Sequence, residues 1–183
     1  MNQWRHRESP HKTGSDQVGR VLSELQQSLA EAADPRDAFA QFSRLLERFL
    51  KIRKGFLALR EGDQMRFLAI ASWRDDGTVR TLSLRLPQVA SFFEKVAEHG
   101  QLYSENITAF FDGNTIERRL LFDDDTVSFM LRPLKHEGQL VGLLGYSSDV
   151  PEAFVTVESG QLDSAFEQLA AVISRRQAVH NPS

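Results

Sequence analysis

Two pairs of short apolar runs, each joined by a polar turn, restrict the fold of this chain more than any other feature. Phe56–Arg60 and Met65–Trp73 flank the turn EGDQ, and Val127–Leu134 and Gln139–Ser147 flank the turn KHEG. Each pair is typical of an antiparallel hairpin, and Gly138 supplies the positive φ that such a turn usually needs. The runs are nearly continuous rather than alternating, so we expect a sheet covered on both faces.

Helical patterns surround the hairpins. Residues 15–32 and 162–179 carry apolar stripes close to heptad register, and Asp34 followed by Pro35 is typical of a helix start between them. The middle of the chain predicts a strand at Val79–Leu84, a helix from Pro87 to Gly100, a short strand at Gln101–Glu105 and a helix at Asn114–Phe122. This order predicts an α+β fold, with a central antiparallel sheet of five to six strands and a helical layer on each face.

Length and charge limit the classes of protein to consider. The chain has 183 residues, which suits one domain over residues 15–180 after a disordered polar leader at 1–14. Its net charge of −3 offers no basic surface for nucleic acid or for an anionic membrane. Without an apolar run of about 18 residues or a signal-like N-terminus, we expect a cytoplasmic protein with no membrane contact.

The sequence contains no cysteine, which excludes disulfides, thiolate catalysis and Cys-ligated metals. The run Asp123–Asp125 and His136 offer oxygen and imidazole groups, but three consecutive residues cannot all face one ion from a regular element. We therefore expect a solvated acidic loop, no metal site, and thermal stability that a chelator leaves unchanged.

The second hairpin and its surroundings resemble the C-terminal part of GAF domains. In that family a strand ends in Pro-Leu, turns through a polar residue and Gly, and returns as a Val-Gly-hydrophobic-hydrophobic-Gly strand. The matching positions here are Pro133, Leu134, Gly138, Val141, Gly142, Leu143, Leu144 and Gly145. The helix that follows, and the helix that leads into the first hairpin, fit the same pattern over roughly residues 20–178. A PAS-like or unrelated α+β domain is the alternative.

The resemblance implies a sheet with the terminal helices on one face and a ligand pocket under helices on the other, together with small-molecule sensing and dimerisation. Departures from the family's sequence patterns exclude some of its known ligands and activities. Covalent bilin and Cys-dependent methionine sulfoxide reduction are excluded because the chain has no Cys. The cyclic-nucleotide branch of the family carries an Asn-Lys pair, a downstream Phe, and an Asp-Glu pair three residues after it. Here Thr115 follows Asn114, and Asp123 directly follows Phe122, so the chain does not match that pattern. The cofactor, if there is one, stays unknown.

Five residues form our candidate ligand site on the pocket face. They are Trp73, Phe92, Tyr103, Phe111 and Arg132. The aromatic side chains are also what a plain core would contain. Arg132 lies between apolar neighbours, where an unpaired charge is costly. It could bind an anionic ligand, pair with the acids Asp123–Asp125, or lie at an exposed end of its strand. Glu117, between Ile116 and two arginines, is expected on an exposed face.

No catalytic motif is recognisable, so we expect a non-enzymatic sensory or regulatory domain in signal transduction. The alternative is an interaction module whose pocket is filled by its own side chains. The two apolar stripes predict a homodimer in which the terminal helices of two chains form a four-helix bundle. The stripe residues that we expect at this interface are Leu22, Leu25, Leu29, Leu162, Phe166, Leu169 and Ile173, with Val18 at the start of the first stripe.

Overall fold

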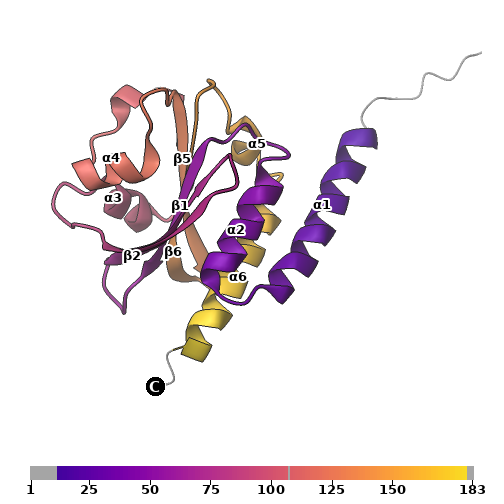
Figure 1. The fold of residues 1–183 in the computed structure, drawn as a ribbon, viewed down its shortest axis with the longest axis horizontal. Coiled ribbons are helices and arrows are strands. Elements are labelled where there is room, and N and C mark those ends of the chain that lie inside the picture. Colours follow the sequence, from indigo (N-terminus) through magenta and orange to yellow (C-terminus); the bar gives the residue numbers. More distant parts are fainter. Residues whose placement is uncertain (1–11, 107, 181–183) are drawn as a thin grey trace, which may run out of the picture.

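A twisted antiparallel sheet of six strands forms the centre of the molecule (Figure 1). The computed structural model describes residues 12–106 and 108–180. The strands are β1 (Lys54–Arg60), β2 (Phe67–Arg74), β3 (Val79–Arg85), β4 (Tyr103–Glu105), β5 (Ser128–His136) and β6 (Gln139–Ser148), in the spatial order β3-β2-β1-β6-β5-β4. Both predicted hairpins form, as β1–β2 and β5–β6, and β1 pairs with β6 to join them into one sheet.

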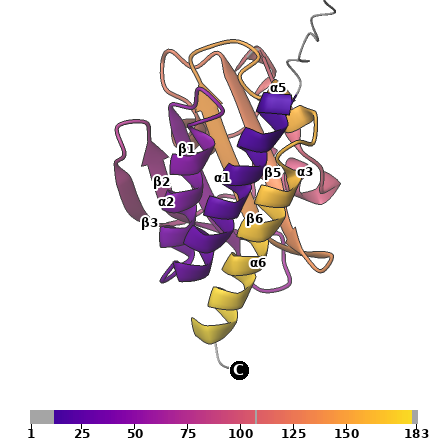
Figure 2. The same ribbon diagram turned by 90° about the vertical axis from the view of Figure 1, so that its right-hand side faces the viewer.

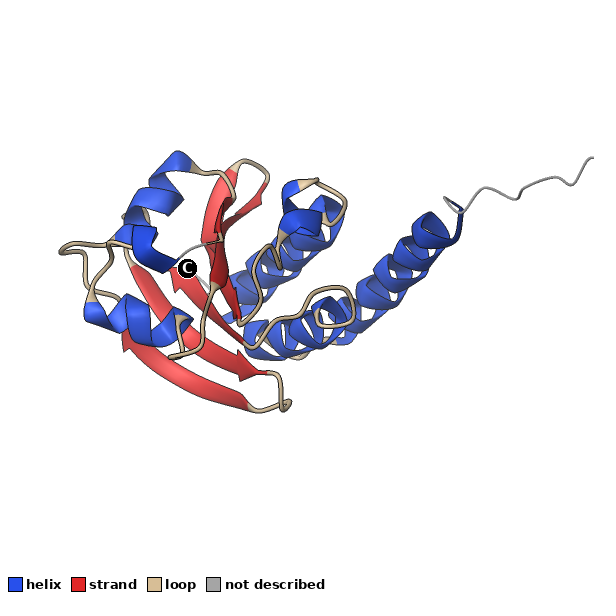
Figure 3. Cartoon of the chain, turned by 90° about the horizontal axis from the view of Figure 1, so that it is seen from above, coloured by secondary structure: helices blue, strands red, loops and turns tan. Residues whose placement is uncertain are grey.

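Helices cover both faces of this sheet, as the continuous apolar runs predict (Figure 3). The helices are α1 (Lys12–Glu31), α2 (Pro35–Leu46), α3 (Phe92–His99), α4 (Thr115–Leu121), α5 (Val155–Glu158) and α6 (Asp163–His180), with a 3₁₀ turn, η1 (Thr108–Phe110). The α2 and α6 helices lie on one face, which we call the terminal-helix face, and α1 packs against both of them from outside (Figure 2). The other face carries α3 and α4, and we call it the α3/α4 face.

Most of the predicted elements exist, with ends shifted by a few residues. The largest shift is at α3, which begins at Phe92 and not at Pro87. Ala90 has a φ of 50°, in the left-handed region, so the chain turns there instead of continuing a helix. The helix then starts behind Ser91, whose hydroxyl accepts a hydrogen bond from the Glu94 amide. At the N-terminus, α1 begins at Lys12, and most of the predicted leader lies outside the described residues.

The two apolar stripes are largely buried within the chain itself. Six of the residues expected at a dimer interface have exposed fractions of 3% or less: Leu25, Leu29, Leu162, Phe166, Leu169 and Ile173. They belong to the core between the terminal helices and the sheet. Val18 and Leu22 are only half-buried. The heptad-like spacing therefore reflects packing of the helices on their own domain, and most of the predicted contact residues are not free for a partner.

Candidate functional site

The centre of the α3/α4 face is filled by aromatic rings. The ring centroid of Phe92 lies 5.1 Å from that of Tyr103 and 4.9 Å from that of Phe111. Phe56 of β1 stacks on Phe93 of α3 at 4.9 Å, with the two rings nearly parallel. Three of the five predicted site residues are therefore neighbours, but their rings are packed as a core.

The other two predicted site residues lie on the terminal-helix face, so the five do not line one cavity. Trp73 is fully buried in the core beneath the terminal helices. The reason is a β-bulge: Leu57 pairs with Ala71 and Ala58 with Ala69, which leaves Ile70 as an extra residue in β2. The bulge reverses the alternation, so Trp73 points away from the face that Phe67 and Ala69 occupy.

Arg132 shares its face with Met130 and Leu134, as the alternation along β5 predicts, and this is the terminal-helix face. Its guanidinium donates a hydrogen bond of 2.9 Å from Nη1 to Oδ1 of Asp163, at the start of α6. It also lies 4.4 Å above the ring of Phe166. Of the alternatives left open for Arg132, pairing with Asp123–Asp125 is therefore wrong, because its partner is Asp163 and these acids lie before the start of β5.

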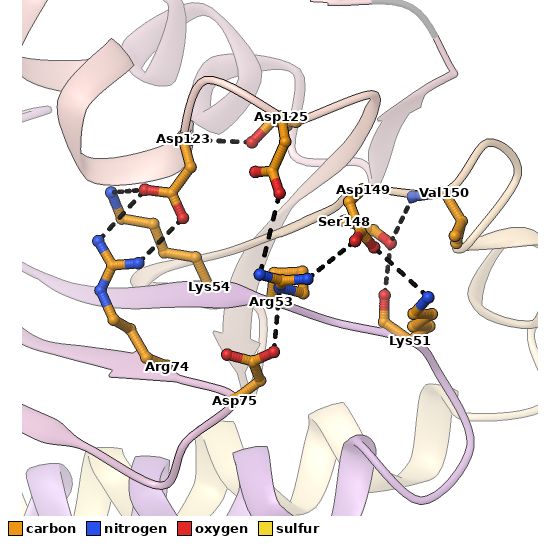
Figure 4. Close-up of polar contacts among 11 residues, drawn as sticks. Lys51, Arg53, Lys54, Arg74, Asp75, Asp123, Asp125, Ser148, Asp149 and Val150 are labelled. Atoms are coloured by element: carbon orange, nitrogen blue, oxygen red, sulfur yellow. Dashed lines mark hydrogen bonds and ion pairs between the residues drawn. The ribbon is translucent and has the colours of Figure 1, made fainter.

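A polar network ties the sheet together at the end where β1 and β5 begin (Figure 4). Arg53, just before β1, holds three carboxylates with different nitrogens. Its Nε lies 3.0 Å from Asp75 in the β2–β3 turn, its Nη1 lies 2.8 Å from Asp149 after β6, and its Nη2 lies 3.8 Å from Asp125. One side chain thus fixes three loops around this end of the sheet.

Lys54 and Arg74, paired across β1 and β2, share the carboxylate of Asp123 (Figure 4). Arg74 donates from both terminal nitrogens, at 3.0 Å and 3.2 Å. Lys54 Nζ donates 2.6 Å to the carbonyl oxygen of Arg119, at the end of α4. The acidic loop is therefore not a purely solvated one: Asp123 and Asp125 anchor the α4–β5 connection to the sheet.

The charges in this cluster shift each other's protonation. Burial lowers the pKa of Lys54, even though the Asp123 carboxylate opposes that shift. Burial alone would raise the pKa of Asp123, but the hydrogen bond from Arg74 and the charge of Lys54 outweigh it and hold this pKa below its ordinary value. Asp123 is consequently charged at neutral pH. Its single negative charge is shared by two cations, Lys54 and Arg74, so the three side chains together remain positive.

A cavity of about 270 Å³ opens next to this pair on the α3/α4 face, between α4 and strands β2 and β3. We call it the cationic cavity, because Lys54, Arg74, Arg80 and Arg119 all line it. Within the described part of the chain, the side chains of Arg80 and Arg119 make neither a hydrogen bond nor an ion pair. Trp73 borders it as well, although its side chain belongs to the other core. This arrangement is suited to bind an anion.

Glu117 is fully buried, against our expectation of an exposed position. Its carboxylate, on α4, accepts hydrogen bonds from the Ser91 hydroxyl and from the backbone amides of Phe92 (2.9 Å) and Phe93 (3.4 Å). It thereby caps the N-terminus of α3, where a negative charge is favourable. Burial raises the pKa of Glu117, and these hydrogen bonds reduce the shift without abolishing it.

Sequence reasoning missed the residues of the cationic cavity. Lys54 and Arg74 stand at the ends of their strands, where charged residues are common and carry little information. The signal that could have identified them is the number of arginines in one region. Arg74, Arg80 and Arg119 lie on elements that the predicted topology already brings together on one face. Cross-strand pairing of Ser72 with Arg80 and of Lys54 with Arg74 completes the convergence, and it depends on a register that the bulge sets.

No protein-family model and no curated protein matches the chain. Solved structures do match it. The GAF domain of a phosphoenolpyruvate-protein phosphotransferase from Coxiella burnetii superposes with a TM-score of 0.73 at 16% identity, covering 92% of this chain and 99% of that one. The corresponding Acinetobacter domain gives a TM-score of 0.70 at 16% identity, covering 90% and 98%. The chain has the GAF fold.

The same GAF fold also appears in an enzyme. The free methionine-R-sulfoxide reductase from Neisseria meningitidis, solved in complex with its substrate, matches with a TM-score of 0.68 at 14% identity, over 98% of this chain and 99% of that one. Identities this low establish the GAF fold and not an activity. What this chain binds must therefore be argued from its own residues.

Proposed function

We propose that this GAF domain is a non-enzymatic regulatory module that binds a small anionic molecule in the cationic cavity. The observation that carries the proposal is the pair Arg80 and Arg119, two arginines that line one cavity without a partner among the described residues. Arginines are usually paired within their own protein or spread over the surface. Arg80 and Arg119 are both exposed, so their convergence on one cavity beside Lys54 and Arg74 is the feature that favours an anionic ligand.

The position of the cavity supports a sensory role. It lies on the face opposite the terminal helices, between the sheet and α4, and it touches the network that fixes the α4–β5 loop. An anion bound by Arg74 or Lys54 competes with Asp123 for the same donors. Occupancy of the cavity would therefore loosen the contact of Asp123 with the sheet, which gives ligand binding a structural consequence.

The non-enzymatic part of the proposal depends on chemistry that the chain lacks. The sequence has no cysteine for thiol chemistry. Among the residues that the structure describes, no group of three or more His, Asp or Glu side chains is arranged to hold a metal ion.

Over the same residues, no helix has the length and apolarity that crossing a membrane requires.

The alternative, an interaction module without a ligand, is favoured by one observation, the closely packed aromatic centre of the α3/α4 face. Calorimetric titration with inorganic phosphate, pyrophosphate and citrate at low ionic strength separates the two functions. We expect binding of at least one of these anions, weakening as salt is added.

Arg80→Gln combined with Arg119→Gln should reduce that affinity by about tenfold or more, because each removes a charge-assisted hydrogen bond. Arg85→Gln is the matched control, since Arg85 lies at the far end of β3 and pairs with Glu61. Failure of all three anions to bind favours the interaction module. Equal binding by the double variant shows that the anion sits elsewhere.

A further inference from the structure

A second cavity lies at the other end of β5, on the terminal-helix side. Its volume is about 400 Å³, and it is bordered by β5, by the α3–β4 connection and by the first turns of α6. Arg132 and Phe166 are in its wall, together with Asp163 and Glu167. None of the residues that line the cationic cavity borders this one, so its function can be judged independently.

Arg132 offers unused hydrogen-bond donors to this cavity. Its side chain is only 16% exposed, and its one hydrogen bond within the described residues goes from Nη1 to Asp163. Stacking on Phe166 consumes no donor, because all guanidinium N–H groups point outward in the plane of the group. A largely buried guanidinium with donors to spare is suited to a carboxylate.

Carboxylates face the same space. Asp163 uses Oδ1 for Arg132 and keeps Oδ2 free of any hydrogen bond in the described chain. Glu167 lies one turn further along α6 and is exposed, and Glu158 accepts a hydrogen bond from the Ser104 hydroxyl with one of its oxygens. These acids attract a cationic group at a short distance from the guanidinium.

The remaining wall is partly apolar, and Lys135 and Gln101 add polar groups to it. Leu102 and Val157 border the cavity from the β4 side and from α5, and Leu134 borders it from β5. A bare anion would be repelled by the acids, and a bare cation would be repelled by Arg132 and Lys135. A molecule that carries both charges satisfies each set of groups, and an apolar substituent on it would contact the leucine and valine side chains.

We propose that this cavity binds a free α-amino acid with an apolar side chain. Its carboxylate is held by the unused donors of Arg132, and its ammonium group is held by Asp163 and Glu167. The ligand would bridge β5 to the start of α6, so binding stabilises the docking of this helix on the sheet. The proposal does not depend on the cationic cavity, whose anionic ligand would lie on the opposite face.

Three matched probes test the two-charge requirement on the full chain. They are L-leucine, 4-methylpentanoate, which lacks the ammonium group, and 3-methylbutylamine, which lacks the carboxylate. Each is titrated by amide chemical-shift mapping up to about 10 mM, where a millimolar dissociation constant approaches saturation. We expect L-leucine to shift the amides of Leu102, Gly160 and Asp163, and each analogue to bind about tenfold more weakly or worse.

Variants assign the effect to this site. Arg132→Gln and Glu167→Gln should each weaken L-leucine binding by about tenfold, whereas Arg48→Gln, in a surface pair with Glu24, should not. Glu167 is exposed, so we expect Glu167→Gln to fold, and it still tests L-leucine binding if Arg132→Gln fails to fold. The proposal is overturned if L-leucine causes no shift at these amides, if 4-methylpentanoate binds equally well, or if Glu167→Gln leaves the affinity unchanged.

Discussion

At Gly145 the absence of a side chain determines how the neighbouring aromatic ring packs on the sheet. It pairs with Phe56 across β6 and β1, and a Cβ atom at this position would collide with the Phe56 ring. The absence of a side chain lets that ring lie flat and stack on Phe93. Gly55 plays the same role beneath Tyr146 on the other face. Of the glycines in the family-like hairpin, Gly145 is therefore explained by space for an aromatic ring, whereas Gly142 lies against the backbone of Ala58 and Gly138 takes a positive φ in the turn.

Gly145→Val should consequently destabilise the protein by about 1–3 kcal/mol, the usual cost of overpacking a core. Gly19→Ala is the matched control, since Gly19 lies in α1 with open space around its Cα. That substitution should stabilise slightly, by about 0.5–1 kcal/mol, as Ala does in a helix. Urea unfolding measures both variants. An unchanged midpoint for Gly145→Val would show that the Phe56 ring is free to move aside.

At the scale of elements, sequence patterns predicted what regular geometry controls and failed where an irregularity intervenes. Alternation along β5 correctly grouped Arg132 with Met130 and Leu134. In β2 the bulge at Ile70 reversed the alternation and moved Trp73 to the other face. A period-two pattern gives no sign of an extra residue, so the face of Trp73 could not be predicted from the sequence. Arg132 needed no bulge to lie on the terminal-helix face, because the regular alternation of β5 places it there with Met130 and Leu134. Likewise, the burial of Glu117 depends on a helix N-terminus that lies 25 residues away in the sequence.

The link from Glu117 to α3 should appear as a pH dependence of stability. Because burial raises the pKa of this carboxyl above its ordinary value of 4.5, the folded state binds the proton more tightly than the unfolded state. The stability that protonated Glu117 contributes is therefore present at low pH and declines as pH rises from about 4.5 through the raised folded pKa. Glu117→Gln cannot titrate, so the wild type should lose stability relative to it over this range.

Chemical unfolding at a series of pH values measures this difference. Glu98→Gln on the exposed side of α3 is the control and should follow the wild type at every pH. If the difference between wild type and Glu117→Gln does not change with pH, the carboxyl does not titrate differently on folding. The cap would then act only through its hydrogen bonds to Ser91 and Phe92.

At the scale of the whole molecule, the resemblance to GAF domains predicted the layers correctly, and the apolar stripes identified α6, which packs on the sheet, and α1, which packs on α2 and α6. They did not identify a free interface, because a heptad-like spacing serves packing within one chain as well as packing between chains. The structure buries α6 almost entirely along its stripe. It leaves the first half of α1 extending beyond the sheet (Figure 3), with Val18 and Leu22 half-buried.

We therefore propose that a homodimer, if it forms, uses the side of α1 that carries Val18 and Leu22. Leu22→Ala is the appropriate variant, because Leu25 is 3% exposed and its removal would damage the domain's own core. Losing about 2 kcal/mol of apolar contact per dimer should raise the dissociation constant about thirtyfold. Gln26→Ala, on the exposed side of the same helix, should leave it unchanged. Light scattering over a dilution series decides between these outcomes, and a wild type that is monomeric at about 50 µM would remove the dimer from consideration.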